Sequence, residues 1–194
     1  MSRPLQFEFV TAAPDVEHLP ATRAEIAFIG RSNVGKSSLL NAIAGGKKLA
    51  HVSNTPGRTQ LLNCFALQQP RATVVDCPGY GFAKVPKAIR DSWQPMIEQY
   101  LVEREHLEMV LLLVDGEIGP TKSDLDMLAW LRAQSLPHTV IVTKHDRVKS
   151  SQRDQREREV AAGCSLPPAE IVWVSSSDNT GIPRLRELIR LWLA

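Results

Sequence analysis

The residues with the most recognisable chemistry form a glycine-rich segment between an apolar run and a helical one. The segment reads Gly30-Arg31-Ser32-Asn33-Val34-Gly35-Lys36-Ser37 and follows the apolar residues 25–29. This G-x-x-x-x-G-K-S spacing is that of a Walker A loop, whose backbone N–H groups wrap phosphate oxygens. In such a loop Lys36 reaches the β and γ phosphates, and the Ser37 hydroxyl is a ligand for Mg²⁺. A glycine-rich turn that only caps a helix is the alternative.

A second candidate segment, Asp76-Cys77-Pro78-Gly79, ends another apolar run. An aspartate at a strand end beside a Walker A loop can hold Mg²⁺ through water, and Gly79 can bring a backbone N–H close to a γ-phosphate. The loop between the two segments contains Thr55 and Thr59. Either hydroxyl can complete the magnesium shell only when a γ-phosphate is present, so the pattern predicts a nucleotide-dependent switch.

Two later segments have the residue types that can read a base. In Thr143-Lys144-His145-Asp146, the aspartate can accept two hydrogen bonds from guanine, a pattern that adenine does not offer, and the lysine stem can lie along the base plane. The segment Ser175-Ser176-Ser177 follows the last apolar run, and its backbone can contact the guanine O6. Each pattern alone is common. Four such loops in this order favour a guanine nucleotide.

The elements that must position these loops alternate between strands and helices. Short apolar runs predict six strands, and apolar stripes with helical spacing predict five helices. This alternation indicates an α/β protein with a mostly parallel six-stranded sheet and helices on both faces, whose ligand lies at the carboxyl ends of the strands. We expect Pro95 to kink its helix or to shift the start of that helix. The expected strands are 25–29, 60–67, 72–76, 109–115, 138–143 and 171–174, and the expected helices are 38–44, 87–105, 121–134, 150–162 and 182–193.

Composition limits the class of protein. The chain has 194 residues, a net charge of +2 and 43% hydrophobic residues, which is ordinary for one globular domain. Its apolar stretches are far shorter than the ~18–20 residues that span a bilayer, so we expect no membrane association. The first residues contain no apolar core typical of a signal peptide. Cys64, Cys77 and Cys164 form no C-x-x-C pair, which disfavours a disulfide framework and fits a cytoplasmic location.

Taken in order, these motifs resemble those of the EngB family of bacterial GTP-binding proteins, also called YihA or YsxC, in the TrmE-Era-EngA-EngB-Septin-like superfamily. The resemblance covers nearly the whole chain. It implies a Ras-like P-loop NTPase fold, GTPase activity, a role in assembly of the large ribosomal subunit, and a requirement in cell division and septation. It also implies an N-terminal extension, residues 1–22, packed on a G domain, residues 23–194. The segments that carry it are 7–13, 30–38, 55–60, 76–81, 114–115, 119–121, 143–146 and 174–176.

The resemblance also implies roles for individual residues. The cofactors would be GTP or GDP and Mg²⁺, with Ser37 and Thr59 as magnesium ligands and Asp76 acting through water. Lys36 and Thr59 would be the catalytic residues. Thr143 stands where most small GTPases have Asn, and its hydroxyl can still brace the P-loop. The implied nucleotide contacts are Gly30, Arg31, Ser32, Asn33, Val34, Gly35, Lys36, Ser37, Ser38, Gly57, Arg58, Thr59, Gln60, Leu61, Asp76, Cys77, Pro78, Gly79, Thr143, Lys144, His145, Asp146, Val174, Ser175 and Ser176.

The expected mechanism lacks one common component. Ras-type enzymes place a glutamine after the Asp-x-x-Gly motif to orient the attacking water, and this chain has Tyr80 there. We therefore expect slow unaided hydrolysis that rests on phosphate positioning, Mg²⁺ and Lys36. Asn33 resembles the asparagine that ligates K⁺ in several related GTPases, although it can equally shape its own loop. A nucleotide-holding interaction protein with negligible turnover is the alternative function, and a P-loop kinase is disfavoured because of the base-reading segment.

The charge is distributed unevenly along the chain. Residues 31–90 contain nine basic residues and one acid, a net charge of +8, so the remaining residues carry −6. An ordinary solvated face is one explanation, and a nucleic-acid-binding surface is the other. Given the resemblance, we expect this basic switch face of a monomeric protein to contact ribosomal RNA of the large subunit. The six residues of the basic switch face are Lys47, Lys48, Arg58, Lys84, Lys87 and Arg90.

Overall fold

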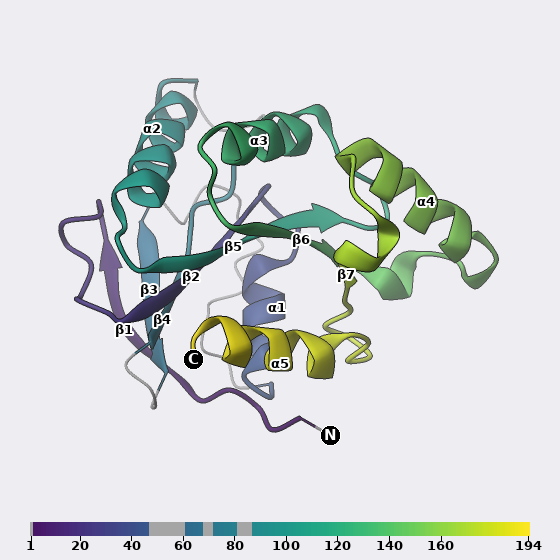
Figure 1. Ribbon diagram of the computed structural model, residues 1–194, viewed down its shortest axis with the longest axis horizontal. Coiled ribbons are helices and arrows are strands. Elements are labelled where there is room, and N and C mark those ends of the chain that lie inside the picture. Colours follow the sequence, from purple (N-terminus) through teal and green to yellow (C-terminus); the bar gives the residue numbers. More distant parts are fainter. Residues whose placement is uncertain (1, 47–60, 68–71, 81–86) are drawn as a thin grey trace.

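The computed structural model describes residues 2–46, 61–67, 72–80 and 87–194 (Figure 1). The elements alternate as the sequence predicts, and most predicted bounds agree within two residues. The strands are β1 (Phe7–Ala13), β2 (Ala24–Gly30), β3 (Leu62–Leu67), β4 (Ala72–Asp76), β5 (Leu107–Asp115), β6 (His138–Thr143) and β7 (Val172–Trp173). The helices are α1 (Lys36–Ile43), α2 (Lys87–Glu103), α3 (Lys122–Ala133), α4 (Arg153–Cys164) and α5 (Ile182–Trp192).

The strands of the described part of the chain form one sheet in the order β1-β3-β4-β2-β5-β6-β7. From β4 to β7 neighbouring strands pair in parallel, whereas β3 is antiparallel to both β1 and β4. The α/β class and the mostly parallel sheet are therefore confirmed. The predicted number of six strands is wrong, because β1 adds a seventh at the edge.

β1 arises from the segment before the expected G domain. Its two ends, Phe7 and Ala13, are buried, and the Phe9 ring meets the Phe65 ring of β3 edge to face at 5.7 Å between centroids. Phe9 itself stays 52% exposed, so the strand has no clean alternation that local sequence could reveal. Its pairing partner lies far along the chain, and tertiary pairing decides its conformation. The division of the chain between residues 22 and 23 stays a prediction.

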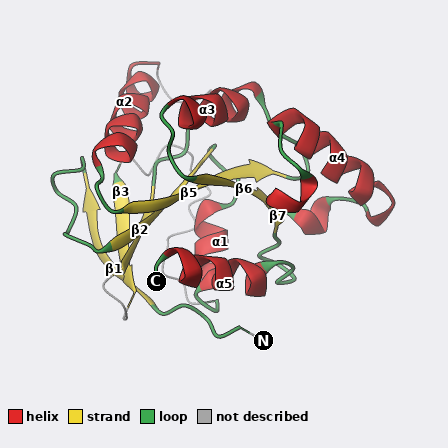
Figure 2. Cartoon of the chain, in the orientation of Figure 1, coloured by secondary structure: helices red, strands yellow, loops and turns green. Residues whose placement is uncertain are grey.

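Helices cover both faces of the sheet, with α1 and α5 on one face and α2, α3 and α4 on the other (Figure 2). Side chains along β2 alternate between the two resulting cores. Ile26 and Phe28 pack with α1 and α5, whereas Ala27 and Ile29 pack with α2, α3 and α4. Because β2 is buried on both faces, its run of apolar residues is continuous rather than alternating. Packing on both faces therefore fixes β2 in the middle of the sheet.

The helices follow the predicted pattern with small differences at their ends. α2 begins at Lys87 and includes Pro95, so the proline does not shift the start of the helix. α3 begins with a capping box in which the Asp124 carboxylate accepts the Thr121 N–H at 2.9 Å. A 3₁₀ turn precedes α4, which begins at Arg153, three residues later than predicted. None of the helices in the described ranges is long and apolar enough to cross a membrane.

The amino end of β2 holds a buried ion pair. Glu25 is 0% exposed, and its two oxygens accept hydrogen bonds from Arg104 Nε at 2.9 Å and Arg104 Nη2 at 3.0 Å. The Tyr100 hydroxyl at 2.8 Å and the Thr73 hydroxyl at 2.6 Å complete its shell. This network links β2, β4 and the end of α2 at the edge of the sheet opposite the predicted loops.

Candidate nucleotide-binding site

The four predicted loops follow β2, β4, β6 and β7 at the carboxyl edge of the sheet, and β5 ends among them. β2 ends at Gly30, β4 at Asp76, β5 at Asp115 and β6 at Thr143. These strands run parallel and side by side, so the four strand ends meet at one edge. This arrangement is the one in which open α/β sheets hold their ligands.

The glycine-rich loop connects β2 directly to α1. Two of its residues have left-handed backbone conformations, Asn33 with φ 63° and Gly35 with φ 108°. Val34 between them is buried, with 3% of its surface exposed. Lys36 and Ser37 are the first residues of α1. The loop therefore turns tightly over the amino end of a helix, where backbone N–H groups are available to an anion.

The Lys36 ammonium lies against the same loop. It donates to the carbonyl of Gly30 at 3.2 Å and is 3.5 Å from the carbonyl of Arg31. Burial lowers the pKa of Lys36, and the charge of Asp76 opposes this shift. The cation therefore lies within the loop, beside the neighbouring strand end.

Asp76 faces the first turn of α1. The Ser37 hydroxyl is 3.5 Å from Asp76 Oδ2, while Asp76 Oδ1 is buried and has no hydrogen-bond partner. Burial raises the pKa of Asp76 to about 6, and Lys36 and the Ser37 hydroxyl act in the opposite direction. A hydroxyl oxygen and a carboxylate oxygen with a free lone pair are the hard donors that Mg²⁺ prefers. These two residues fit a magnesium site.

Gly79 joins the Asp76 segment to the glycine-rich loop. The Ser32 hydroxyl donates to the Gly79 carbonyl at 3.0 Å, and the Ser32 N–H donates to the Tyr80 carbonyl at 3.0 Å. A Cβ at position 79 would lie 2.8 Å from both the nitrogen and the Cα of Ser32. Because both are backbone atoms, only glycine allows this close approach.

Thr143 connects the end of β6 to the glycine-rich loop. Its hydroxyl lies 2.6 Å from the Val34 carbonyl and 3.2 Å from the Val114 carbonyl. One hydroxyl proton is shared between the two, with the shorter contact on the loop. The interpretation that Thr143 braces the P-loop is therefore supported by its geometry.

The segments at the ends of β6 and β7 lie together. The His145 N–H donates to the Val174 carbonyl at 3.1 Å, and the His145 ring packs edge-on against Trp173 at 5.8 Å between centroids. Burial raises the pKa of Asp146, but hydrogen bonds from the hydroxyls of Ser175 and Ser177 outweigh it, so the pKa lies below its ordinary value. Asp146 is exposed, and at neutral pH it presents an ionised carboxylate to solvent.

Comparison with known proteins identifies the family. Residues 25–144 match the family model described as 50S ribosome-binding GTPase. A "Probable GTP-binding protein EngB" of Citrifermentans bemidjiense is 44% identical over 177 residues, which cover 91% of this chain and 82% of that protein. The protein of that name in Myxococcus xanthus is 43% identical over 189 residues, covering 94% and 92%. This chain belongs to the EngB family of GTP-binding proteins.

Solved structures agree with the EngB assignment. A crystal structure of "a probable GTP-binding protein engB" superposes with a TM-score of 0.73 at 25% identity, covering 88% of this chain and 98% of that one. Aquifex aeolicus Era, solved with GDP·AlF4⁻, gives a TM-score of 0.72 at 23% identity over 90% of this chain and 58% of that one. The similarity to Era shows the fold alone.

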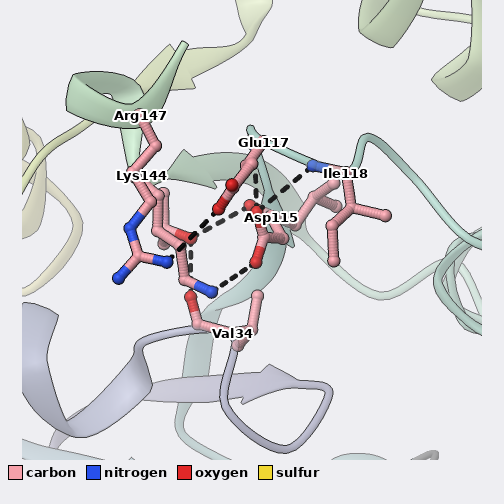
Figure 3. Close-up of polar contacts among 8 residues, drawn as sticks. Val34, Asp115, Glu117, Ile118, Lys144 and Arg147 are labelled. Carbon is pink, nitrogen blue, oxygen red and sulfur yellow. Dashed lines mark hydrogen bonds and ion pairs between the residues drawn. The ribbon is translucent and has the colours of Figure 1, made fainter.

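Asp115 is a site residue to which sequence reasoning gave no role in this EngB-family chain. It is the last residue of β5, 5% exposed, and its Oδ2 forms an ion pair with the Lys144 ammonium (Figure 3). A cavity beside this pair is lined by both side chains, by Ile118 and by Arg31, Ser32, Asn33 and Val34 of the glycine-rich loop. The segment Val114-Asp115 was part of the resemblance, but only the pairing of β5 with β6 shows what Asp115 contacts.

The Tyr80 side chain contacts α3. Its hydroxyl donates to Asp124 Oδ1 of α3 at 3.1 Å, and its ring packs against the core beneath α2 and α3. Burial, and then the Asp124 charge, raise the pKa of Tyr80 well above its ordinary value. The phenol is therefore neutral and engaged by a buried carboxylate.

Cys77 is a buried thiol beside Asp76. It is 0% exposed, its N–H donates to the Phe28 carbonyl at 3.0 Å, and burial raises its pKa well above the usual range. A fully buried thiol with a raised pKa is an inert core cysteine rather than a reactive one.

Some predicted contacts are not tested by this geometry. Leu61 is described and is 37% exposed just before β3, and Ser38 lies in the first turn of α1. The predicted residues that lie outside the described ranges are Thr55, Gly57, Arg58, Thr59 and Gln60.

Proposed function

We propose that the protein is a magnesium-dependent GTPase that cycles slowly between GTP-bound and GDP-bound forms and acts as a switch in assembly of the large ribosomal subunit. The observation that carries the proposal is the convergence of two segments, 76–79 and 143–146, on the glycine-rich loop. Ser32 bonds to Gly79, Thr143 bonds to Val34, and Ser37 faces Asp76. A phosphate-binding loop is thus coupled to a carboxylate and to a base-reading segment, as a GTP-binding family requires.

The proposed phosphate site is the amino end of α1. The loop N–H groups of 30–38 bind the α and β phosphates, and the Lys36 ammonium moves from the Gly30 carbonyl to the β and γ oxygens. Its position within the loop supports this role, because it lies 3.2 Å from that carbonyl. The carbonyl pairs the ammonium with a neutral acceptor, so exchanging it for a charged phosphate oxygen is favourable.

The proposed magnesium ligands are Ser37 directly and Asp76 through water, with Thr59 completing the shell. Support comes from the free lone pair of Asp76 Oδ1 and its neighbour Ser37. When bound there, Mg²⁺ would neutralise negative charge that develops on the phosphates. The residues of this chain hold the phosphates in line with an attacking water and supply the Lys36 charge.

The proposed base site combines 143–146 with 174–176. Asp146 reads the guanine N1–H and exocyclic amine, and the hydroxyls that lower its pKa keep it ionised as an acceptor. The backbone of Ser175 and Ser176 approaches the guanine O6. The buried Ser175, whose N–H donates to the Thr180 carbonyl at 2.9 Å, holds that loop in place.

In this proposal Tyr80 does not accelerate hydrolysis, and a K⁺ ion near Asn33 does. Asn33 is exposed in a left-handed conformation within the glycine-rich loop, where its side chain faces solvent and can take part in holding K⁺. The same conformation is also one that asparagine adopts to shape a loop. Hydrolysis in K⁺ and Na⁺ at equal ionic strength, with N33A alongside, separates the two roles.

The proposed partner is the large ribosomal subunit, in keeping with the family description 50S ribosome-binding GTPase. A cytoplasmic monomer would present the basic switch face to ribosomal RNA. Loss of this contact would impair ribosome assembly and, with it, cell division and septation. Of that face, Lys47, Lys48, Arg58 and Lys84 lie outside the described ranges. The net charge of +8 over residues 31–90 supports the choice of a nucleic-acid partner.

The base site is tested by exchanging one carboxylate. In D146N the amide presents a donor, so preference should move from GDP toward XDP by at least tenfold. D178N is the matched control, because Asp178 lies in the neighbouring loop and its carboxylate accepts the Thr180 N–H at 2.9 Å. Retained preference for GDP in D146N would refute the base assignment.

The switch itself is tested by single-turnover hydrolysis of GTP with and without large ribosomal subunits. A switch predicts slow hydrolysis that the subunits accelerate. Absence of measurable turnover in both conditions would favour the alternative of a nucleotide-holding interaction protein.

A further inference from the structure

Asp115 and Lys144 come together because two parallel strands end in register. Asp115 of β5 pairs with Thr143 of β6, and the Gly116 N–H donates to the Thr143 carbonyl at 2.9 Å. Lys144 is the next residue along, so its ammonium reaches back to Asp115 Oδ2 (Figure 3). The sheet itself therefore sets the distance between the two charges.

The Asp115 carboxylate is held on both oxygens. Oδ1 accepts the backbone N–H of Glu117 at 2.9 Å and lies 3.4 Å from the nitrogen of Ile118, which leaves Oδ2 for Lys144. These bonds from a side chain to the backbone that follows it form an Asx turn, which fixes the direction of the carboxylate. Asp115 is 5% exposed, so its carboxylate is buried and lies deeper than the Lys144 side chain.

Lys144 needs such a fixed partner. Its backbone has φ 57°, a left-handed conformation that lysine rarely adopts. Its side chain is 23% exposed and borders the cavity formed with the glycine-rich loop. A flexible four-carbon stem loses rotamer freedom when it is confined. Anchoring its ammonium before the ligand arrives removes that loss from binding.

We propose that Asp115 is a positioning residue for nucleotide binding: it holds the Lys144 ammonium and so fixes the lysine stem, before the ligand binds, where it packs against the purine. This inference rests on the proposed function and adds to it a residue that does not itself touch the ligand. The stem contacts the flat face of the base and not its edge. Asp115 therefore contributes to affinity for any purine nucleotide, whereas Asp146 selects guanine.

The decisive variants are D115N, K144M and their combination. Asn keeps an acceptor for the Glu117 N–H and removes the charge, while Met keeps the stem and removes the ammonium. We expect D115N to raise the dissociation rate of GDP about tenfold, because preorganisation and retained contacts act mainly on dissociation. In the K144M background, D115N should have no further effect. A role of Asp115 confined to the turn would give the same penalty in both backgrounds and would overturn the proposal.

A second readout separates positioning from base selection. IDP lacks the exocyclic amine that Asp146 reads, so D115N should weaken GDP and IDP by the same factor and leave their ratio unchanged. A changed ratio would overturn the proposal, since Asp115 would then act through Asp146. D115S, which also keeps an acceptor for the turn, replaces D115N if that variant does not fold.

The matched control is E117Q on the same turn. Glu117 and Arg147 form a pair at 3.2 Å with side chains 51% and 58% exposed, and Figure 3 shows it beside the buried pair. E117Q should leave GDP dissociation unchanged. If the wild-type protein bound no guanine nucleotide, the proposed function would fail. If it bound GDP normally and D115N matched it, only the present inference would fail.

Discussion

The most quantitative prediction concerns Arg104, whose replacement by Met should strongly destabilise the protein. Met retains most of the aliphatic stem but removes three hydrogen bonds, two to Glu25 and one of 2.6 Å to the Pro20 carbonyl. Among the described residues, Glu25, at 0% exposure, would keep the Tyr100 and Thr73 hydroxyls as its donors. A buried carboxylate is then left without its counter-charge.

Removing one partner of a buried ion pair costs about 3–5 kcal/mol of unfolding free energy. For a chain of this length each kcal/mol lowers the melting temperature by about 2–4 °C, so R104M should melt about 6–20 °C lower than the wild type. Urea unfolding followed by tryptophan fluorescence and circular dichroism measures the loss directly. R147M is the matched control, because Arg147 pairs with Glu117 on the exposed surface and should change stability by less than about 1 kcal/mol.

The same variant tests how the network relates to the candidate site. Glu25 and Gly30 lie at opposite ends of β2, so R104M should bind GDP like the wild type at temperatures where it is folded. The double variant E25Q/R104M should lose less than the sum of the single losses, since neither charge remains. A loss in R104M no larger than that in R147M would refute the reasoning, because the buried pair would then behave as a surface one.

Two further predictions concern titratable side chains. Burial raises the pKa of Cys64 to about 12 and also raises that of Cys77 and Cys164, so a thiol reagent at pH 8 should modify none of the three in native protein and all of them in denaturant. The exposed His18 has a raised pKa, mainly from its hydrogen bond to Asp15. An NMR titration should give a His18 midpoint above 6.5 that falls in D15N; the small stabilisation from this pair is present at low pH and is lost as pH rises through the native His18 pKa. Native labelling, or an unchanged His18 midpoint in D15N, would contradict the respective prediction.

Most of the fold could be predicted from local patterns, and β1 shows why the remainder could not. β2, β5 and β6 are continuous apolar runs between polar segments, and burial on both faces makes such strands easy to recognise. In β1 only Phe7 and Ala13 are buried, whereas the middle of the strand is exposed or intermediate. Its conformation comes from pairing with β3, a contact between distant segments that no short pattern encodes.

The candidate site divides in the same way. Residues predicted to act through backbone geometry or base recognition, such as Gly79 and Asp146, lie in motifs with fixed spacing. Asp115 is a single acid after an apolar run, which is a common feature of strand ends. Its contact with Lys144 depends on the pairing of Asp115 with Thr143 across two strands, and register of this kind is a property of the assembled sheet.

Tyr80 stands at the position where Ras-type enzymes have a glutamine, and its side chain contacts α3. The Asp124 carboxylate that accepts its hydroxyl also accepts the Thr121 N–H and hydroxyl at the start of that helix. Freeing the phenol would therefore leave Asp124, which is 2% exposed, with one buried hydrogen bond fewer, at a cost of about 1–3 kcal/mol. A phenol with a pKa raised well above its ordinary value stays protonated at neutral pH and is not a base that takes a proton from water. Position 80 ties the segment after Asp76 to α3, and in the proposed mechanism the attacking water is oriented by another group.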